Sequence, residues 1–267
     1  MPGCLDEPFE QHAAEALEIL LNADGKLVTE SLRDYTRINL GKAYDSLDGF
    51  LQAWNSAERK AALIEELEGR GVFLDALADD VGSHRLFAID IATGKAEALT
   101  GAGHVAGFSA GTDSLVYGFD TLNSPVDLYR LTLANGRTAR LTQHNADTLA
   151  DVRFGDYEQF SFAGAGGDTV YGHVMKPWNY RKGKKYPVAF IIHGGPQGSM
   201  GNDWHYRWNP AVYAGWGYAV VFIDFHGSTG YGQAFTDAIR LDWGGKPLED
   251  LQKGWAHALS TYDFLDG

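Results

Sequence analysis

The 267-residue sequence predicts a mixed fold with three successive parts: an all-α segment at residues 1–82, repeated β-hairpins at residues 83–155, and a parallel α/β unit at residues 156–267. Three observations predict this order. The first part is acidic, with apolar residues at helical spacing. A strand-turn-strand pattern recurs in the second, and short apolar runs alternate with glycine turns in the third.

Composition narrows the classes of function. The net charge of −13 disfavours nucleic-acid binding through a general basic field. Cys4 is the single cysteine, so no intramolecular disulfide can form. The acidic N-terminus lacks the features of a signal peptide, and no apolar run approaches the ~20 residues that cross a bilayer. We therefore expect a cytoplasmic protein with neither a membrane nor a nucleic-acid partner.

Apolar residues at helical spacing predict a small helical bundle in the first segment. The residues on one face of the helix capped by Ser46 are Leu47, Phe50, Leu51 and Trp54. The sequence from Lys26 to Val72 resembles the C-terminal helical domain of the motor subunit of type I restriction endonucleases, which is a docking module. The resemblance implies a protein partner for residues 1–82. An amphipathic bundle that packs on the rest of the chain explains the same apolar stripe.

A repeat predicts the second segment. Residues 86–100 and 128–142 align residue for residue at an offset of 42, and each reads as a strand, a turn and a second strand. The offset lies in the ~40–50-residue range of propeller blades, and propellers have ~4–8 blades. The pattern therefore indicates a fragment of a β-propeller, whose strand edges are exposed unless another element covers them.

Alternating strands and helices predict the third segment. Residues 156–177 read as a hairpin around Gly166 and Gly167. Val188–Ile192 and Tyr218–Ile223 are short apolar runs typical of buried parallel strands, and glycine turns follow both. Such turns at the carboxyl ends of parallel strands build binding sites. A final helix starts at Pro247, and its predicted apolar face consists of Leu248, Leu251, Trp255, Leu259 and Tyr262.

Three motifs carry a resemblance to a known family. HGGP at residues 193–196, GSTGYG at 227–232 and DWGGKPLEDL at 242–251 are similar, in order and spacing, to the catalytic domain of the prolyl oligopeptidase family of serine peptidases, in its acylaminoacyl-peptidase and dipeptidyl-peptidase V branch. The likeness runs from about Leu86 to the last residue. It implies a propeller fragment followed by the first half of an α/β-hydrolase domain, with short peptides as substrates. Where many relatives have Arg, this chain has His226.

The resemblance implies which residues form the site. Acyl transfer requires N–H donors aimed at the developing oxyanion, and the resemblance assigns that donor to Gly195, with Gly194 shaping the turn. The alternative is a tight turn without a catalytic function. In the family the nucleophile elbow follows the element at which this sequence stops. We therefore expect the serine, aspartate and histidine of the triad to be missing and the chain alone to be inactive.

Other candidate residues have simpler interpretations. Ser109 lies in the only G-x-S-x-G pattern but precedes Gly195 by 86 residues within the repeat, so we reject it as the nucleophile. His193 is expected to pack locally, and His226 either faces a substrate cleft or caps a turn. His205 lies in an aromatic cluster that is core or pocket wall.

Glu249 and Asp250 suit the first turn of a helix, where the helix dipole favours carboxylates. No metal-ligand spacing or complete dinucleotide loop occurs in the sequence, so we expect neither a metal nor a cofactor.

Two alternatives to a peptidase stay open. In one, a restriction-subunit docking module is fused to a passenger peptidase fragment. In the other, the chain is a non-natural chimeric gene product whose unrelated parts meet near Val81, Gly82 and Ser83.

Overall fold

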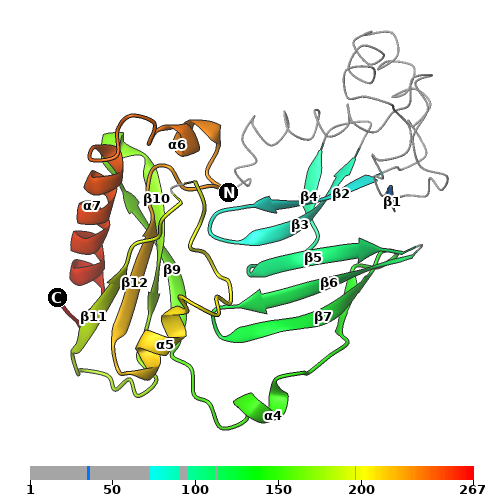
Figure 1. Ribbon diagram of the computed structural model, residues 1–267, viewed down its shortest axis with the longest axis horizontal. Helices are drawn as coiled ribbons and strands as arrows, with labels where there is room; N and C mark the ends of the chain where they lie inside the picture. Colours follow the sequence, from blue (N-terminus) through cyan, green and yellow to red (C-terminus); the bar gives the residue numbers. More distant parts are fainter. Residues whose placement is uncertain (1–34, 37–72, 91–94, 112, 196) are drawn as a thin grey trace.

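Two β-sheets lie side by side in the computed structural model (Figure 1), which describes residues 35–36, 73–90, 95–111, 113–195 and 197–267. The first sheet comes from the repeated hairpins and the second from the α/β unit. No helix in the described ranges is long and apolar enough to cross a membrane.

The first sheet has eight strands in the order β1-β2-β3-β5-β6-β7-β8, with β4 paired to β3. The strands are β1 (Tyr35–Thr36), β2 (Phe73–Asp79), β3 (His84–Asp90), β4 (Ala96–Ala98), β5 (His104–Ala110), β6 (Ser114–Thr121), β7 (Ser124–Thr132) and β8 (Arg137–Arg140). Its core contains Leu86, Val105, Leu115, Tyr117 and Leu131. A short helix, α4 (Ala146–Leu149), follows β8.

The predicted repeat is confirmed in its hydrogen bonds. The hairpins β3–β4 and β7–β8 are both antiparallel. In the first, Leu86 N–H donates to Thr100 Oγ1 and Leu99 N–H donates to Leu86 O; in the second, residues 42 positions later make the same two bonds. Equivalent residues thus close the two hairpins in the same way. That these hairpins belong to a β-propeller remains a prediction.

The second sheet has five strands in the order β13-β11-β12-β10-β9. They are β9 (Tyr157–Ala163), β10 (Thr169–Met175), β11 (Tyr186–Ile191), β12 (Ala219–Asp224) and β13 (Leu265–Asp266). β11 pairs in parallel with β12 and β13, whereas β10 pairs antiparallel with β9 on one side and β12 on the other. The predicted hairpin and both predicted parallel strands are confirmed, with a short 3-10 turn, η1 (Ala165–Gly167), between β9 and β10.

Helices cover both faces of this sheet (Figure 1). Because side chains alternate along a strand, Val221 and Ile223 face α7 (Lys246–Thr261), whereas Val220 and Phe222 face α5 (Pro210–Gly215). A short helix, α6 (Gln233–Asp237), follows the GSTGYG turn. The overall architecture is therefore mixed α/β, with a covered five-stranded sheet next to an eight-stranded sheet.

The predicted buried face of α7 is only partly right. Its buried residues are Pro247, Asp250, Gly254 and Ala258, whereas Leu248 is 47% exposed. A side chain at Gly254 would place its Cβ 2.2 Å from Ile223 Cδ1, so the helix approaches the sheet through its small residues. Leu251, Leu259 and Tyr262 pack, partly buried, against the same core, as predicted.

The prediction of an all-α segment is wrong for residues 73–79, which form β2 and pair antiparallel with β3 from Phe73 to Asp79. Tyr35 and Thr36 also form a short strand, β1. Alanine and leucine in β2 favour helix by intrinsic propensity, but pairing with β3 overrides that weak preference. The rest of the helical segment, and the stretch that resembles a restriction subunit, lie outside the described residues.

Loops of the first sheet contact loops of the second through hydrogen bonds. Leu122 N–H donates to Asn202 Oδ1 at 3.1 Å, and Asn202 N–H donates to Gly82 O at 2.8 Å. Trp204 N–H donates to Asp120 Oδ1 at 2.7 Å. These contacts bring the first sheet against the loop that follows β11.

Replacement of Asp75 by Asn should remove a pH-dependent loss of stability. Asp75 is 9% exposed, and no described residue donates to either of its carboxylate oxygens. Burial raises the pKa of Asp75 to about 7, above an unfolded value near 3.9, so stability is lost as pH rises from about 4 through about 7. Between about pH 5 and about pH 8, the free energy of unfolding should fall by about 2 kcal/mol more in the parent chain than in Asp75→Asn.

Urea unfolding at both pH values measures this difference. Asp156→Asn is the matched control, because the Asp156 side chain is 88% exposed and its removal should leave the pH dependence of the parent chain unchanged. An identical pH dependence in the parent chain and in Asp75→Asn would contradict the prediction.

Candidate active site

The candidate oxyanion turn begins directly after β11, and the His193 ring holds its first residue. His193 Nδ1 lies 3.1 Å from Gly194 O, and His193 Nε2 lies 3.0 Å from Ser228 Oγ. Because a carbonyl only accepts, Nδ1 donates to Gly194 O, whereas the serine hydroxyl can bond to Nε2 either as donor or as acceptor. The ring also stacks on Phe225 with centroids 4.5 Å apart. The expected local packing of His193 is therefore confirmed.

Gly195 has the backbone geometry expected of a donor turn. Its φ of 141° lies in the region that favours glycine. Gly195 is exposed, and no acceptor among the residues that the structure describes takes its N–H. An exposed N–H without a protein partner is free to donate to a ligand. Gly194, by contrast, shows no positive φ and has open space around it.

Beneath this turn, a buried carboxylate joins the ends of two loops. Asp224, the last residue of β12, is 3% exposed. It accepts hydrogen bonds from Ser199 Oγ at 2.5 Å, from Tyr231 OH at 2.6 Å and from Met200 N at 2.9 Å. Burial raises the pKa of Asp224, and burial beside this carboxylate raises the pKa of Tyr231 well above its usual value.

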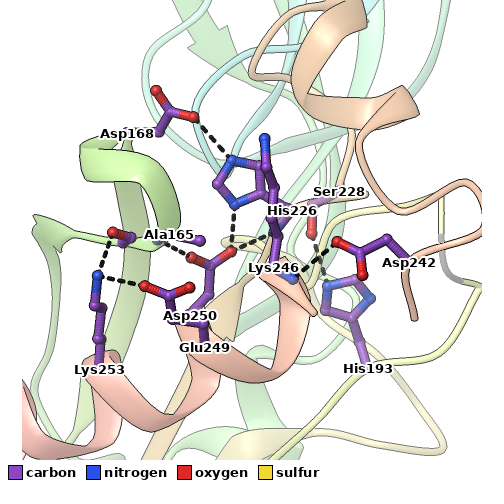
Figure 2. A network of polar contacts seen from close by, with 11 residues as sticks. Ala165, Asp168, His193, His226, Ser228, Asp242, Lys246, Glu249, Asp250 and Lys253 are labelled. Atoms are coloured by element: carbon purple, nitrogen blue, oxygen red, sulfur yellow. Dashed lines mark hydrogen bonds and ion pairs between the residues drawn. The ribbon is translucent and has the colours of Figure 1, made fainter. Parts of the chain in front are cut away.

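A second buried carboxylate joins α7, η1 and the end of β12 (Figure 2). Asp250 is fully buried and accepts from three donors: Ala165 N at 2.7 Å, His226 N at 2.7 Å and His226 Nδ1 at 2.5 Å. His226 Nε2 lies 3.1 Å from Asp168 Oδ2. Each nitrogen of the His226 ring therefore lies within hydrogen-bond distance of a carboxylate oxygen.

Neither predicted alternative describes His226. Its side chain is 1% exposed, so it does not face a cleft, and it bonds to α7 and the β9–β10 turn rather than capping its own turn. Its ring stacks on Phe235 with centroids 4.2 Å apart. Asp250 also has a role beyond the helix dipole, because it accepts hydrogen bonds from Ala165 of η1 and from His226 after β12.

A groove of about 720 Å³ opens beside the turn. Its walls include His193, Gly194, His205, Trp208 and Tyr213. Trp208 is 52% exposed, so the aromatic cluster around His205 belongs to a pocket wall rather than to the core. Concave sites lined by aromatic side chains and a few polar groups are typical of ligand pockets.

The serine of the G-x-S-x-G pattern is not in an elbow. Ser109 is exposed in the middle of β5 and pairs with Val116 of β6 in an antiparallel ladder. A nucleophile elbow requires a sharp turn between a strand and a helix. The rejection of Ser109 is therefore confirmed. Within the part of the chain that the structure describes, no three His, Cys, Asp or Glu side chains are grouped as metal ligands.

The motifs, the parallel strands and the exposed Gly195 N–H agree with comparisons against known proteins. Residues 204–267 match the prolyl oligopeptidase family. The dipeptidyl-peptidase 5 of Schizosaccharomyces pombe is 49% identical over 110 residues, which are 41% of this chain and 16% of that protein. The probable dipeptidyl-peptidase 5 of Emericella nidulans is 41% identical over 198 residues, which are 71% of this chain.

The solved structure of an acylaminoacyl peptidase has a similar arrangement. The Pyrococcus horikoshii acylaminoacyl peptidase superposes with a TM-score of 0.63 at 25% sequence identity, covering 72% of this chain and 30% of that one. The mixed α/β fold is thus similar to that of an acylaminoacyl peptidase. The matched region of this chain spans only 27% of the length of the Emericella nidulans relative.

The sequence analysis did not identify Asp224 or Asp168, and it assigned Asp250 only to a helix dipole. Asp224 carries a signal that was available, because it is the only charged residue in the apolar run from Ala219 to Phe225. Asp250 shares a helix face with Pro247, Gly254 and Ala258, which marks a closely packed stripe. Asp168 carries no comparable signal, because its side chain is 59% exposed and it bonds to a residue distant in the sequence.

Replacement of Asp250 by Ala should destabilise the chain strongly. It removes the shared acceptor of Ala165 N–H and His226 and leaves buried donors unpaired, which costs about 3–5 kcal/mol of unfolding free energy. The neighbouring Glu249 pairs only with Lys253 on the surface and is 49% exposed, so Glu249→Ala should cost less than about 1 kcal/mol. Urea unfolding followed by tryptophan fluorescence measures both. Similar losses in the two variants would show that Asp250 is not a specific acceptor.

Proposed function

We propose that this chain is part of a serine peptidase of the prolyl oligopeptidase family that hydrolyses short peptides. The observation that carries the proposal is the exposed N–H of Gly195, for which the described residues provide no acceptor, in a glycine turn at the carboxyl end of β11. The match of residues 204–267 to the family and the likeness to dipeptidyl-peptidase 5 support it. Release of dipeptides or removal of acylated residues is the finer proposal, based on the names of these relatives.

The proposed chemistry is acyl transfer. A serine oxygen attacks the scissile carbonyl, a histidine takes the serine proton and gives it to the leaving amine, and an aspartate orients the histidine. The carbonyl oxygen becomes negative in the tetrahedral intermediate, and the Gly195 N–H donates to it. Gly194 keeps the turn open to the substrate. None of the described serines or histidines of this chain is proposed as nucleophile or base, and we propose that residues 1–267 alone are inactive.

The first sheet is proposed to restrict access to the site. Its two equivalent hairpins are consistent with blades of a propeller, and its loops contact the segment that follows the oxyanion turn through Asn202 and Trp204. A peptide that reaches Gly195 would pass between this sheet and the groove that contains Trp208. Only substrates that are short or extended would fit such a passage.

A hybrid enzyme tests the proposal. Residues 156–267 of this chain replace the matching segment of the Schizosaccharomyces pombe dipeptidyl-peptidase 5, and hydrolysis of a dipeptidyl p-nitroanilide is measured. We expect activity within about tenfold of the parent enzyme. In the hybrid, Gly195→Ala should lower kcat by about 10²–10³, because a Cβ strains the turn and misplaces the donor.

Gly198→Ala is the matched control for this measurement. Gly198 lies in the same loop, but a Cβ there meets nothing within 4 Å, so kcat should stay within about threefold. An inactive hybrid, or equal losses in the two variants, would count against a catalytic role for this turn.

A further inference from the structure

The loop that carries the proposed oxyanion donor is held at both ends. At its start, His193 stacks on Phe225, and its Nε2 lies 3.0 Å from Ser228 Oγ. At its end, Ser199 and Met200 donate to the buried carboxylate of Asp224. His193 Nε2 also lies 3.5 Å from Asp224 Oδ1, so the same carboxylate reaches the start of the loop. One side chain therefore contacts both ends of the segment from His193 to Met200.

The middle of the loop has little conformational preference of its own. Gly194, Gly195 and Gly198 lack side chains that would restrict the backbone. The described backbone bond in this part runs from Thr229 N to Gly198 O at 3.2 Å, and it comes from the second glycine turn. That second turn is itself tied to Asp224 by Tyr231 OH. The direction of the Gly195 N–H thus depends on contacts outside the loop.

We propose that Asp224 is a positioning residue for the peptidase reaction, which fixes the Gly195 N–H by anchoring both glycine turns to the end of β12. The catalytic meaning of this inference rests on the proposed function, whereas the anchoring itself does not. Asp224 is buried beneath the turn and acts through the backbone. Displacement of a catalytic group by about 1 Å can cost about 10²-fold in rate, so a buried anchor of this kind matters for chemistry.

The hydrogen-bond pattern predicts how substitutions behave. Alanine removes all the acceptors for Ser199, Met200 and Tyr231. Asparagine keeps one oxygen for the Met200 N–H, and its amide group can donate to the hydroxyl oxygens of Ser199 and Tyr231, because hydroxyls accept as well as donate. Asp224→Asn should therefore retain the anchor that Asp224→Ala loses.

Hydrogen exchange of the full chain, read at the Met200 amide, tests the inference, because this N–H donates to Asp224. Asp224→Ala should speed exchange of this amide by about tenfold or more, and Asp224→Asn by less than about threefold. Tyr231→Phe and Ser199→Ala each remove one donor and should give intermediate increases, which keeps the test decisive even if Asp224→Ala does not fold. Asp250→Ala is the control, because it removes a second buried carboxylate with no bond to this loop.

Each outcome decides the inference. Faster exchange of the Met200 amide without a similar change in the rest of the chain, with rescue by Asn, supports it. Exchange in Asp224→Ala no faster than in Asp250→Ala overturns it, and so does an Asp224→Asn chain that exchanges as fast as Asp224→Ala. Exchange is measured without substrate, so an inactive hybrid enzyme would overturn the proposed function while the anchoring would still be decided by the exchange rates.

Discussion

Backbone N–H groups in loops that leave a sheet must find acceptors once they are buried, and in this chain aspartates supply them. Asp224 accepts from Met200, Asp250 from Ala165 and His226, and Asp120 from Trp204. These carboxylates are 3%, 0% and 4% exposed, respectively. Each lies where two or more irregular segments meet. The glycine-rich turns are therefore ordered mainly by buried side chains and less by their own conformational preferences.

The two buried carboxylates near the carboxyl end of β12 have different partners. Asp250 of α7 accepts from the backbone N–H of Ala165 and from the backbone and ring of His226, with Asp168 on the other side of that ring. Asp224 accepts from two hydroxyls and a backbone N–H. Asp250 thus links a helix to two other segments, whereas Asp224 links two loops to the end of a strand.

The elements that the sequence predicted correctly depend on local patterns. The hairpin around Gly166, the strands that flank the glycine turns and the helix from Lys246 follow from periodicity and turn residues over a few positions. The strand β2 does not, because its alanines and leucines suit a helix and only the partner strand β3 decides its state. The partners of Asp250 lie 85 and 24 positions away, so no local pattern could assign them.

Contacts at residues 81 and 82 hold the first sheet against the second. Val81 N–H donates to Gly230 O at 3.1 Å, and Val81 O accepts from Gln159 Nε2 at 2.8 Å. A Cβ at Gly201 would lie 2.3 Å from Gly82 O, so the two backbones approach as closely as only glycine permits. The described residues from Phe73 onward therefore pack as one unit, in which the first sheet and the candidate site share a boundary.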